Sequence, residues 1–172
     1  MSEILTPQNG KELSDDRPAL VLDTNTVLAL WMFRDPALTR LREWIDAGNC
    51  QLFSREDALE ELRQVLAYRQ FGLDAAMQGA LLRKYRASVR ILAAGTPEMH
   101  TAHRAPLPVC RDPDDQKFLE IMRSADAAAL ITRDKALLRL ARHSLIRPNF
   151  AILSPEAFLA QTLRLDVTAT TP

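Results

Sequence analysis

The sequence has few cysteines, no long apolar run and no signal peptide pattern. Its two cysteines, Cys50 and Cys110, are too few for a disulfide framework and show no metal-ligand spacing with the three histidines. We expect both to be structural thiols in a reducing compartment. No segment reaches about 18 consecutive apolar residues, and the first residues lack a basic region followed by an apolar one. We therefore expect a cytoplasmic protein that does not enter a membrane.

The sequence also lacks an excess of charge. Lysine and arginine together number 22, and so do aspartate and glutamate, so no global basic field announces a polyanion partner. A nucleic acid would have to be held locally. Hydrophobic residues make up 47% of the chain and charged residues 26%, which excludes the disordered and fibrous classes. A length of 172 residues is enough for one domain with its own core.

Short apolar runs alternate with segments of helical periodicity. The runs predict strands buried on both faces, at residues 19–22, 50–53, 88–92, 128–132 and 150–153. Helices are predicted over residues 24–33, 36–48, 55–69 with Ser54 as N-cap, 73–87, 114–125 and 135–142, and from Pro155 onward. This alternation predicts an α/β fold with a parallel sheet covered on both sides. We expect a single domain over 18–165 with loose tails at 1–17 and 166–172.

Two aspartates follow predicted strands directly. Asp23 ends the run "ALVL", and Asp134 follows "ALIT" with Arg133 between. Ligands of open parallel sheets bind outside the carboxyl ends of the strands, so both carboxylates belong to the edge where a site would form. The alternative interpretation is that each aspartate is only the N-cap of the helix that follows.

Helix geometry selects two further carboxylates. In "CRDPDDQKFLEIM", Asp115 projects roughly 30° from the centre of the apolar face. In "SREDALEELRQVLAY", Glu61 lies at the edge of the buried stripe, whereas Glu60 points to solvent. The alternatives are Asp112 as a helix cap, Asp114 and Asp115 as residues favoured by the helix dipole, and Glu61 in a surface ion pair.

These four carboxylates would repel one another at one edge of the sheet and raise each other's pKa. A divalent cation would resolve the conflict, and oxygen ligands without histidine or cysteine suit Mg²⁺ or Mn²⁺. A metal in such a site binds phosphates, activates a water and stabilises an in-line displacement. A chain without net charge could then act on a polyanion.

Four segments in order, "LVLDTNTVLAL", "ALEELRQVL", "DPDDQKFLEIM" and "LITRDKALL", resemble the PIN-domain family of metal-dependent nucleases. The resemblance spans about residues 19–163 and is strongest to the toxins of toxin-antitoxin systems. It implies a three-layer α/β/α sandwich with a central parallel sheet, acidic residues around Mg²⁺ or Mn²⁺, and endonucleolytic cleavage of RNA. It also implies a homodimer and an antitoxin that inserts a basic residue into the acidic site.

Carried over motif by motif, the resemblance makes the catalytic and metal-binding set Asp23, Glu61, Asp115 and Asp134. Asn25, Asp112, Asp114 and Thr132 would support it, with Asp112 and Asp114 as competitors of Asp115 for the third position. Arg133 stands where many family members have a small residue, which leaves a substrate contact open.

Residues for holding the RNA backbone are predicted with less support, because a solvated helix face is the better explanation for most of them. They are Arg83, Lys84, Arg86, Arg90, Arg133, Arg139, Arg142 and His143. For Trp31 and Trp44, helical spacing with leucines favours core packing over base stacking.

Two other functions are consistent with parts of the sequence. "DTNTV" resembles the Asp-x-Asp-x-Thr/Val nucleophile loop of haloacid-dehalogenase-like phosphatases, but Asn25 replaces the second acid. A non-catalytic module of the PIN fold that binds RNA or a protein is the alternative from a different class.

Overall fold

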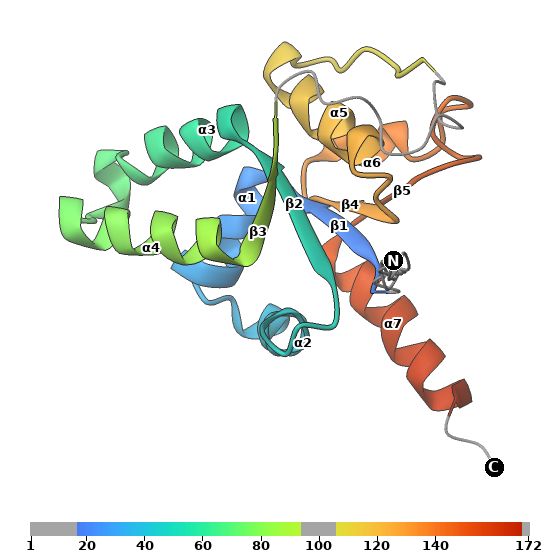
Figure 1. Cartoon of the computed structure of the whole chain (residues 1–172), viewed down its shortest axis with the longest axis horizontal. Helices are drawn as coiled ribbons and strands as arrows, with labels where there is room; N and C mark the ends of the chain where they lie inside the picture. The colour runs from blue at the N-terminus through green and yellow to red at the C-terminus, as the bar shows by residue number, and fades with distance from the viewer. Residues whose placement is uncertain (1–16, 94–105, 170–172) are drawn as a thin grey trace, which may run out of the picture.

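The computed structural model describes residues 17–93 and 106–169. Its five strands are β1 (Ala19–Leu22), β2 (Gln51–Arg55), β3 (Val89–Leu92), β4 (Ala129–Ile131) and β5 (Ala151–Leu153). They form one parallel sheet in the order β3-β2-β1-β4-β5 (Figure 1). The five predicted strands and their parallel arrangement are therefore confirmed.

Helices and short helical turns connect the strands. They are α1 (Thr24–Val27), the π-helical turn η1 (Leu28–Met32), η2 (Pro36–Leu38), α2 (Thr39–Asp46), α3 (Glu56–Leu66), η3 (Arg69–Phe71), α4 (Ala75–Ser88), η5 (Pro113–Asp115), α5 (Gln116–Ser124), α6 (Lys135–Leu140) and α7 (Pro155–Ala169). Helices α5 and α6 pack on one face of the sheet, and α2, α3, α4 and α7 pack on the other. The three-layer α/β/α architecture is confirmed.

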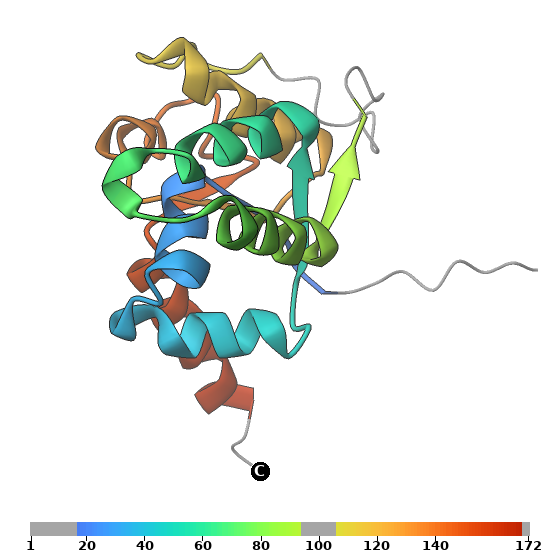
Figure 2. The same ribbon diagram turned by 90° about the vertical axis from the view of Figure 1, so that its left-hand side faces the viewer.

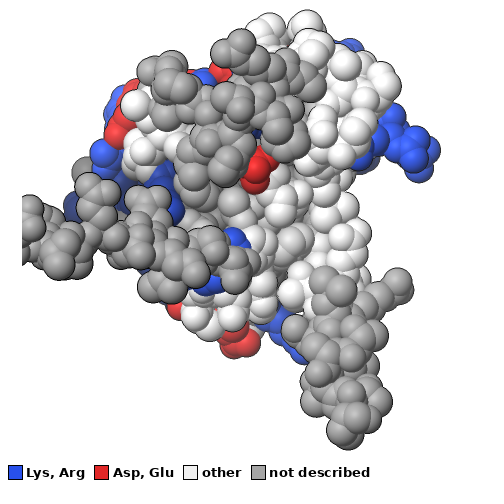
Figure 3. All heavy atoms as spheres, turned by 45° about the vertical axis from the view of Figure 1, so that its right-hand side comes forward, with Lys and Arg blue, Asp and Glu red and all other residues white. Residues whose placement is uncertain are grey.

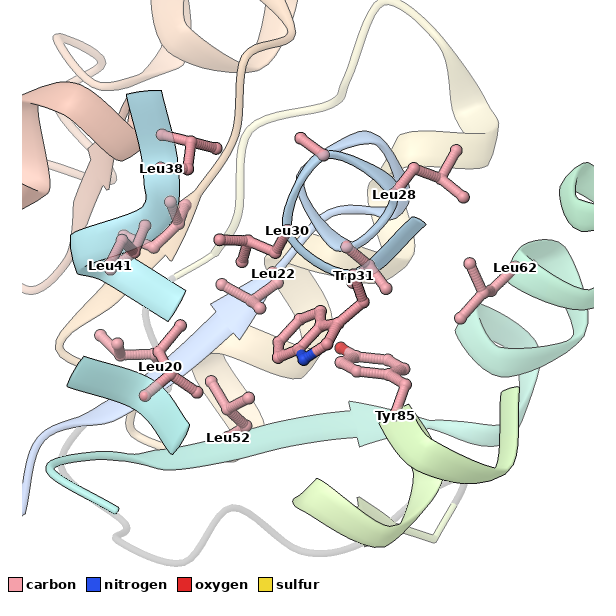
Figure 4. Close-up of a cluster of buried hydrophobic side chains, with 14 of the residues drawn as sticks. Leu20, Leu22, Leu28, Leu30, Trp31, Leu38, Leu41, Leu52, Leu62 and Tyr85 are labelled. Carbon is pink, nitrogen blue, oxygen red and sulfur yellow. The ribbon is translucent and has the colours of Figure 1, made fainter. Parts of the chain in front are cut away.

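Strand β1 shows how the sheet separates two hydrophobic clusters. Leu20 and Leu22 enter the cluster that contains Trp31 and Tyr85, whose rings lie 5.5 Å apart (Figure 4). Val21 points to the opposite face and packs in the cluster of α5 and α6. All three β1 side chains are almost fully buried, and each contributes about 1.5–3 kcal/mol of transfer free energy. The short apolar run is therefore the centre of the molecule.

The tryptophans pack as expected. Trp31 is buried, and Trp44 is half-buried with its ring edge-on to Phe158, at a centroid distance of 5.6 Å. Both cysteines are buried and free. Burial raises the pKa of each thiol to about 11, so they are structural thiols as predicted.

The start of α3 differs from the prediction. Ser54 is not its N-cap, because β2 continues to Arg55 and pairs Ser54 with Ile91 of β3. Pairing with β3 keeps this residue extended, so its side chain lies buried with a hydrogen bond to Tyr85 instead of reaching a helix end. The helix begins at Glu56, after an Arg55 that makes no side-chain cap bond.

Several boundaries also shift. The predicted helix over 24–33 widens into a π-helical turn, and α3 ends at Leu66 because the chain turns through η3 to Gly72, where φ is +61°. Helix α7 runs to Ala169, so the domain end expected at residue 165 falls inside it. No glycine or proline lies between residues 156 and 171 to stop this helix. The predicted tail at 1–17, apart from Arg17, and residues 170–172 lie outside the described residues.

Candidate acidic site at the strand ends

The strand order creates a point where a site can form. From β1 the sheet proceeds to β2 on one side and to β4 on the other, and ligands of parallel sheets bind outside the carboxyl ends at such a switch point. Leu22 of β1 and Ile131 of β4 are register partners, so the residues that follow them are neighbours. The backbone N–H of Asp23 donates to the carbonyl of Ile131 at 3.2 Å. Asp23 and Thr132 therefore meet at this point.

A single hydroxyl joins the two aspartates that follow the strands. Asp23 is 3% exposed, and its Oδ1 accepts the backbone N–H of Thr26 at 2.7 Å. Its Oδ2 accepts a hydrogen bond from the hydroxyl of Thr132. The same hydroxyl oxygen accepts the backbone N–H of Asp134 at 2.9 Å. We call Asp23, Thr132 and Asp134 the inner group.

Both aspartates of the inner group also cap helices, as the alternative interpretation predicted. Asp134 Oδ1 accepts the backbone N–H groups of Ala136 at 2.6 Å and Leu137 at 3.0 Å. Asp23 does the same for α1 through Thr26. Capping does not use up a carboxylate, which has about four lone-pair sites. Within the described parts of the chain, both bonds to Asp134 go to Oδ1, which leaves Oδ2 for another partner.

Burial governs the electrostatics of Asp23. Loss of solvent raises the pKa of this carboxyl, whereas the hydrogen bonds from Thr132 and Thr26 lower it, and the charge of Asp134 adds a smaller rise. A cation beside Asp23 would offset this rise, because it would favour the ionised form of the carboxyl.

A second set of acids lies across a pocket of about 410 Å³ between α3 and the η5–α5 segment. Six carboxylates and one lysine belong to its lining, which consists of Asp57, Glu60, Glu61, Gln64, Val65, Tyr68, Asp112, Asp114, Asp115 and Lys117. We call Glu61, Asp115 and Lys117 the outer group.

The two adjacent glutamates of α3 point in different directions, as predicted. Glu61 is half-buried and accepts a hydrogen bond from the ammonium of Lys117, with side chains 27% and 16% exposed respectively. Glu60 is exposed and pairs with Arg63 at 2.6 Å. Sequence reasoning did not single out Lys117, because nothing in its spacing distinguishes it from a surface lysine.

Asp115 is half-buried at the end of η5. Burial raises its pKa to about 6, and the negative charges of Asp134, Asp112, Glu61 and Asp23 add to this rise. The other three predicted acids are thus near enough to act on Asp115. Asp112 caps η5 by accepting the N–H of Asp114 at 3.0 Å, which confirms its predicted capping role.

The donor set fits a hard divalent cation. The four predicted ligands offer only carboxylate oxygens, the type that Mg²⁺ and Mn²⁺ prefer. Burial is the main cause of the raised pKa of Asp23 and of Asp115, and the charge of Asp134 adds to both. Among the residues that the structure describes, no three of these side chains stand close enough together to enclose one ion. The inner group is connected by hydrogen bonds, whereas in the outer group Lys117 pairs with Glu61.

The other predicted residues around this site differ in their exposure and in their ion pairs. Asn25 is exposed at the start of α1. Arg133 lies on the surface, where its guanidinium pairs with Asp35 at 2.8 Å and with Glu156. Arg86 pairs with Glu56 at 2.6 Å. These ion pairs occupy two of the side chains that were candidates for RNA.

The remaining basic candidates are exposed. They are Arg83, Lys84, Arg90, Arg139, Arg142 and His143. On the face shown in Figure 3, lysine and arginine side chains are scattered among acidic and neutral ones. In the described part of the chain, no helix is long and apolar enough to span a bilayer.

Comparisons with known proteins agree with this geometry. The family model described as the PIN domain matches residues 19–136, a range that runs from β1 to just beyond Asp134. The fold is similar to the crystal structure of PAE2754 from Pyrobaculum aerophilum, with a TM-score of 0.51, 19% sequence identity and coverage of 96% of this chain and 100% of that one. At this identity the similarity shows the fold alone. No curated protein matches the sequence.

Proposed function

This chain belongs to the PIN-domain family, and we propose that it is a metal-dependent endoribonuclease that hydrolyses phosphodiester bonds in RNA. PIN domains are generally nucleases and usually use divalent metal ions. The observation that carries the proposal is the hydrogen-bonded arrangement of Asp23, Thr132 and Asp134 at the strand ends, with Asp115 of the acidic pocket near enough to feel the charge of both aspartates. Carboxylates from separate segments thus approach one another at the switch point of the sheet.

Asp23, Asp115 and Asp134 would hold Mg²⁺ or Mn²⁺, and Glu61 would complete the site or orient the attacking water. When bound, the ion would polarise the phosphate and favour hydroxide formation from water. Thr132 would keep the inner aspartates in a fixed relative position, because its hydroxyl is hydrogen-bonded to both. Asn25, exposed beside Asp23, is proposed as a hydrogen-bond partner of the water or the substrate.

Lys117 gives the outer group a cation of its own. Its ammonium lies against Glu61 and therefore weakens the repulsion between this glutamate and the other carboxylates. The ammonium has three N–H donors, so it can bond Glu61 and still offer a donor to a phosphate oxygen. We propose that Lys117 positions Glu61.

The proposal extends to a toxin role with an antitoxin partner and a homodimer, as the family resemblance implies. The acidic pocket supports the antitoxin partner, since its six carboxylates would attract a basic side chain of an inhibitor. The phosphatase hypothesis is not retained, because the family model that matches is that of the PIN domain.

The experiment that tests the proposal follows an end-labelled single-stranded RNA with the purified protein in Mg²⁺, Mn²⁺ or EDTA, wild type beside Asp23→Asn. Asparagine keeps an oxygen for the N–H of Thr26 and so preserves the cap while it removes the charge. We expect cleavage only with metal, and a rate at least about 100-fold lower in the variant, the scale of one lost electrostatic contact in the transition state. Full activity in EDTA, or in a folded variant, would contradict the proposal.

A further inference from the structure

Three aromatic rings form a contiguous row that begins at the acidic pocket, in which the two outer rings are exposed and the middle ring is half-buried. Tyr68 belongs to the lining of this pocket. Phe71 stacks on Tyr68 with a centroid distance of 6.3 Å and an interplanar angle of 21°. Phe33 meets Phe71 edge-on, with centroids 5.7 Å apart. We call Phe33, Tyr68 and Phe71 the aromatic row.

Two rings of the row are exposed to solvent, although the hydrophobic effect favours burial of aromatic side chains in the interior. Phe33 is 60% exposed and Tyr68 is 52% exposed. Single exposed apolar residues are common, but a contiguous group marks a binding surface. The rings come from two separate segments, the end of η1 and the turn around η3, which Figure 2 shows at one edge of the molecule beside α1. The row therefore depends on the tertiary fold and is not a single exposed ring of one segment.

We propose that the aromatic row is a platform on which unpaired bases of RNA stack while the adjoining phosphodiester enters the acidic pocket. This inference rests on the proposed function and narrows its substrate to single-stranded segments. Every base offers a π-face, so stacking on aromatic side chains is strong without being sequence-specific. The row shares Tyr68 with the pocket, so a strand lying along it leads directly to the acids.

Two exposed arginines beside the row favour RNA as its occupant, with a metal ion offsetting the carboxylates of the adjoining pocket. Arg34 follows Phe33 in the chain and Arg69 follows Tyr68, and both arginines are exposed. They can contact phosphates on either side of a stacked base. Because the chain has no net charge, its contacts with the RNA backbone have to come from such local positive side chains. Lys117 supplies a third positive charge at the inner end, in the pocket itself.

The test measures RNA binding by fluorescence anisotropy with a labelled 12-nucleotide single strand, in Mn²⁺ and with Asp134→Asn as background to suppress cleavage. Phe33→Leu and Tyr68→Leu remove the π-face but keep an apolar side chain. Each should weaken binding by about 5- to 100-fold, the equivalent of one lost stacking contact. Tyr68→Phe should restore binding. The matched control is Met77→Leu, since Met77 is 51% exposed on α4 outside the row.

Two further measurements separate stacking from a structural effect. The same sequence annealed into a duplex should bind the parent and the row variants equally, because its bases are not free to stack. In the cleaving protein, Phe33→Leu should raise KM with little change in kcat.

Equal affinity of the row variants and their parent for the single strand would overturn the inference. So would a change in oligomeric state by analytical ultracentrifugation without a change in RNA affinity, because the row would then be a protein interface. Cleavage by the wild type together with unaffected binding by the variants would reject the platform alone. Absence of cleavage, with binding that depends on the row, would reject the nuclease proposal alone. A wild type that binds no RNA would overturn both.

Discussion

The inner and outer groups of the acidic site are built differently. The inner group stands on strand ends, and its members are joined to each other and to helix N-termini by hydrogen bonds. The outer group stands on α3 and on the η5–α5 segment, and an ion pair joins its Glu61 to its Lys117. Asp23 and Thr132 are buried, whereas Glu61 and Asp115 are half-buried.

This difference separates fixed geometry from adjustable charge. A buried carboxylate is costly unless it is hydrogen-bonded, and Asp23 meets this condition with Thr26 and Thr132. Its position is therefore set by the fold without any ligand. Glu61 depends on one flexible lysine, so its position responds to whatever competes for that ammonium. The acidic site is therefore preorganised at the strand ends, whereas the position of Glu61 can respond to a ligand.

The largest effect is expected from removing an inner charge. Asp134→Asn should lower metal-dependent RNA cleavage by at least about 100-fold, while asparagine still caps α6. Cleavage assays beside melting curves would check this. Asp74→Asn is the control, because Asp74 caps α4 in the same manner by accepting the N–H of Met77. If Asp134→Asn loses stability and keeps its activity, Asp134 serves only as a helix cap.

A smaller effect is expected from disconnecting the inner group without changing its charge. Thr132→Val should weaken Mn²⁺ affinity, measured by calorimetry, by about 10- to 100-fold, as for other residues that orient metal ligands. It should also destabilise the fold by about 1–3 kcal/mol, because Asp23 loses a buried donor. Thr132→Ser keeps the hydroxyl and should restore the affinity. Equal Mn²⁺ affinity of the valine and serine variants would show that the shared hydroxyl has no role in the site.

The outer group can be tested with adjacent glutamates. Glu61→Gln should reduce cleavage or Mn²⁺ affinity by about tenfold, since it removes a ligand or the partner of Lys117. Glu60→Gln should leave both unchanged, because Glu60 pairs with Arg63 on the surface. Rates and binding isotherms for the two variants decide the matter. Equal losses, or a larger loss for Glu60→Gln, would speak for bulk charge instead of a specific site.

The smallest effect concerns stability at Asp115. In EDTA at pH 7, Asp115→Asn should melt at or above the temperature of the wild type, because it removes repulsion from the other acids. In saturating Mn²⁺ the order should reverse, since only the wild type gains the full binding free energy. Melting curves in both buffers provide the measurement, with Asp46→Asn as the control because Asp46 is exposed at the end of α2, outside the acidic pocket.

The pH dependence of this effect has a definite sign. The folded-state pKa of Asp115 is about 6, above its ordinary value, so between about pH 4 and 6 the folded chain binds more protons than the unfolded one. This group therefore lowers the free energy of unfolding as the pH rises through that window. The advantage of Asp115→Asn in EDTA should disappear near pH 4. A variant less stable by the same margin, about 0.3–1 kcal/mol, in EDTA and in Mn²⁺ would make Asp115 only a helix-dipole residue.

The inner group could be predicted from the sequence because its causes are local. A fully apolar run ending in an aspartate predicts both a buried strand and the residue at its carboxyl end, and Thr132 and Asp134 follow the same rule after β4. The direction of Glu61 also followed from periodicity alone.

Features that depend on tertiary contacts were missed. Ser54 has the chemistry of a cap, but pairing with β3 decided its conformation. Lys117 became part of the site because α3 and α5 lie side by side, which its sequence position does not reveal. The aromatic row joins Phe33 with Phe71 across two segments, and no short motif predicts that meeting.

The bond between Thr132 and Asp23 has a consequence for how the chain becomes active during folding. These residues are 109 positions apart in the sequence, and they meet only after β4 has paired with β1. Contacts of such separation form late and slowly, because loop closure precedes any gain from them. During refolding, helical signal should thus recover before cleavage activity does. A nascent chain that has not yet released β4 from the ribosome would carry no assembled inner group, so the acidic site cannot form before β4 is available to pair with β1.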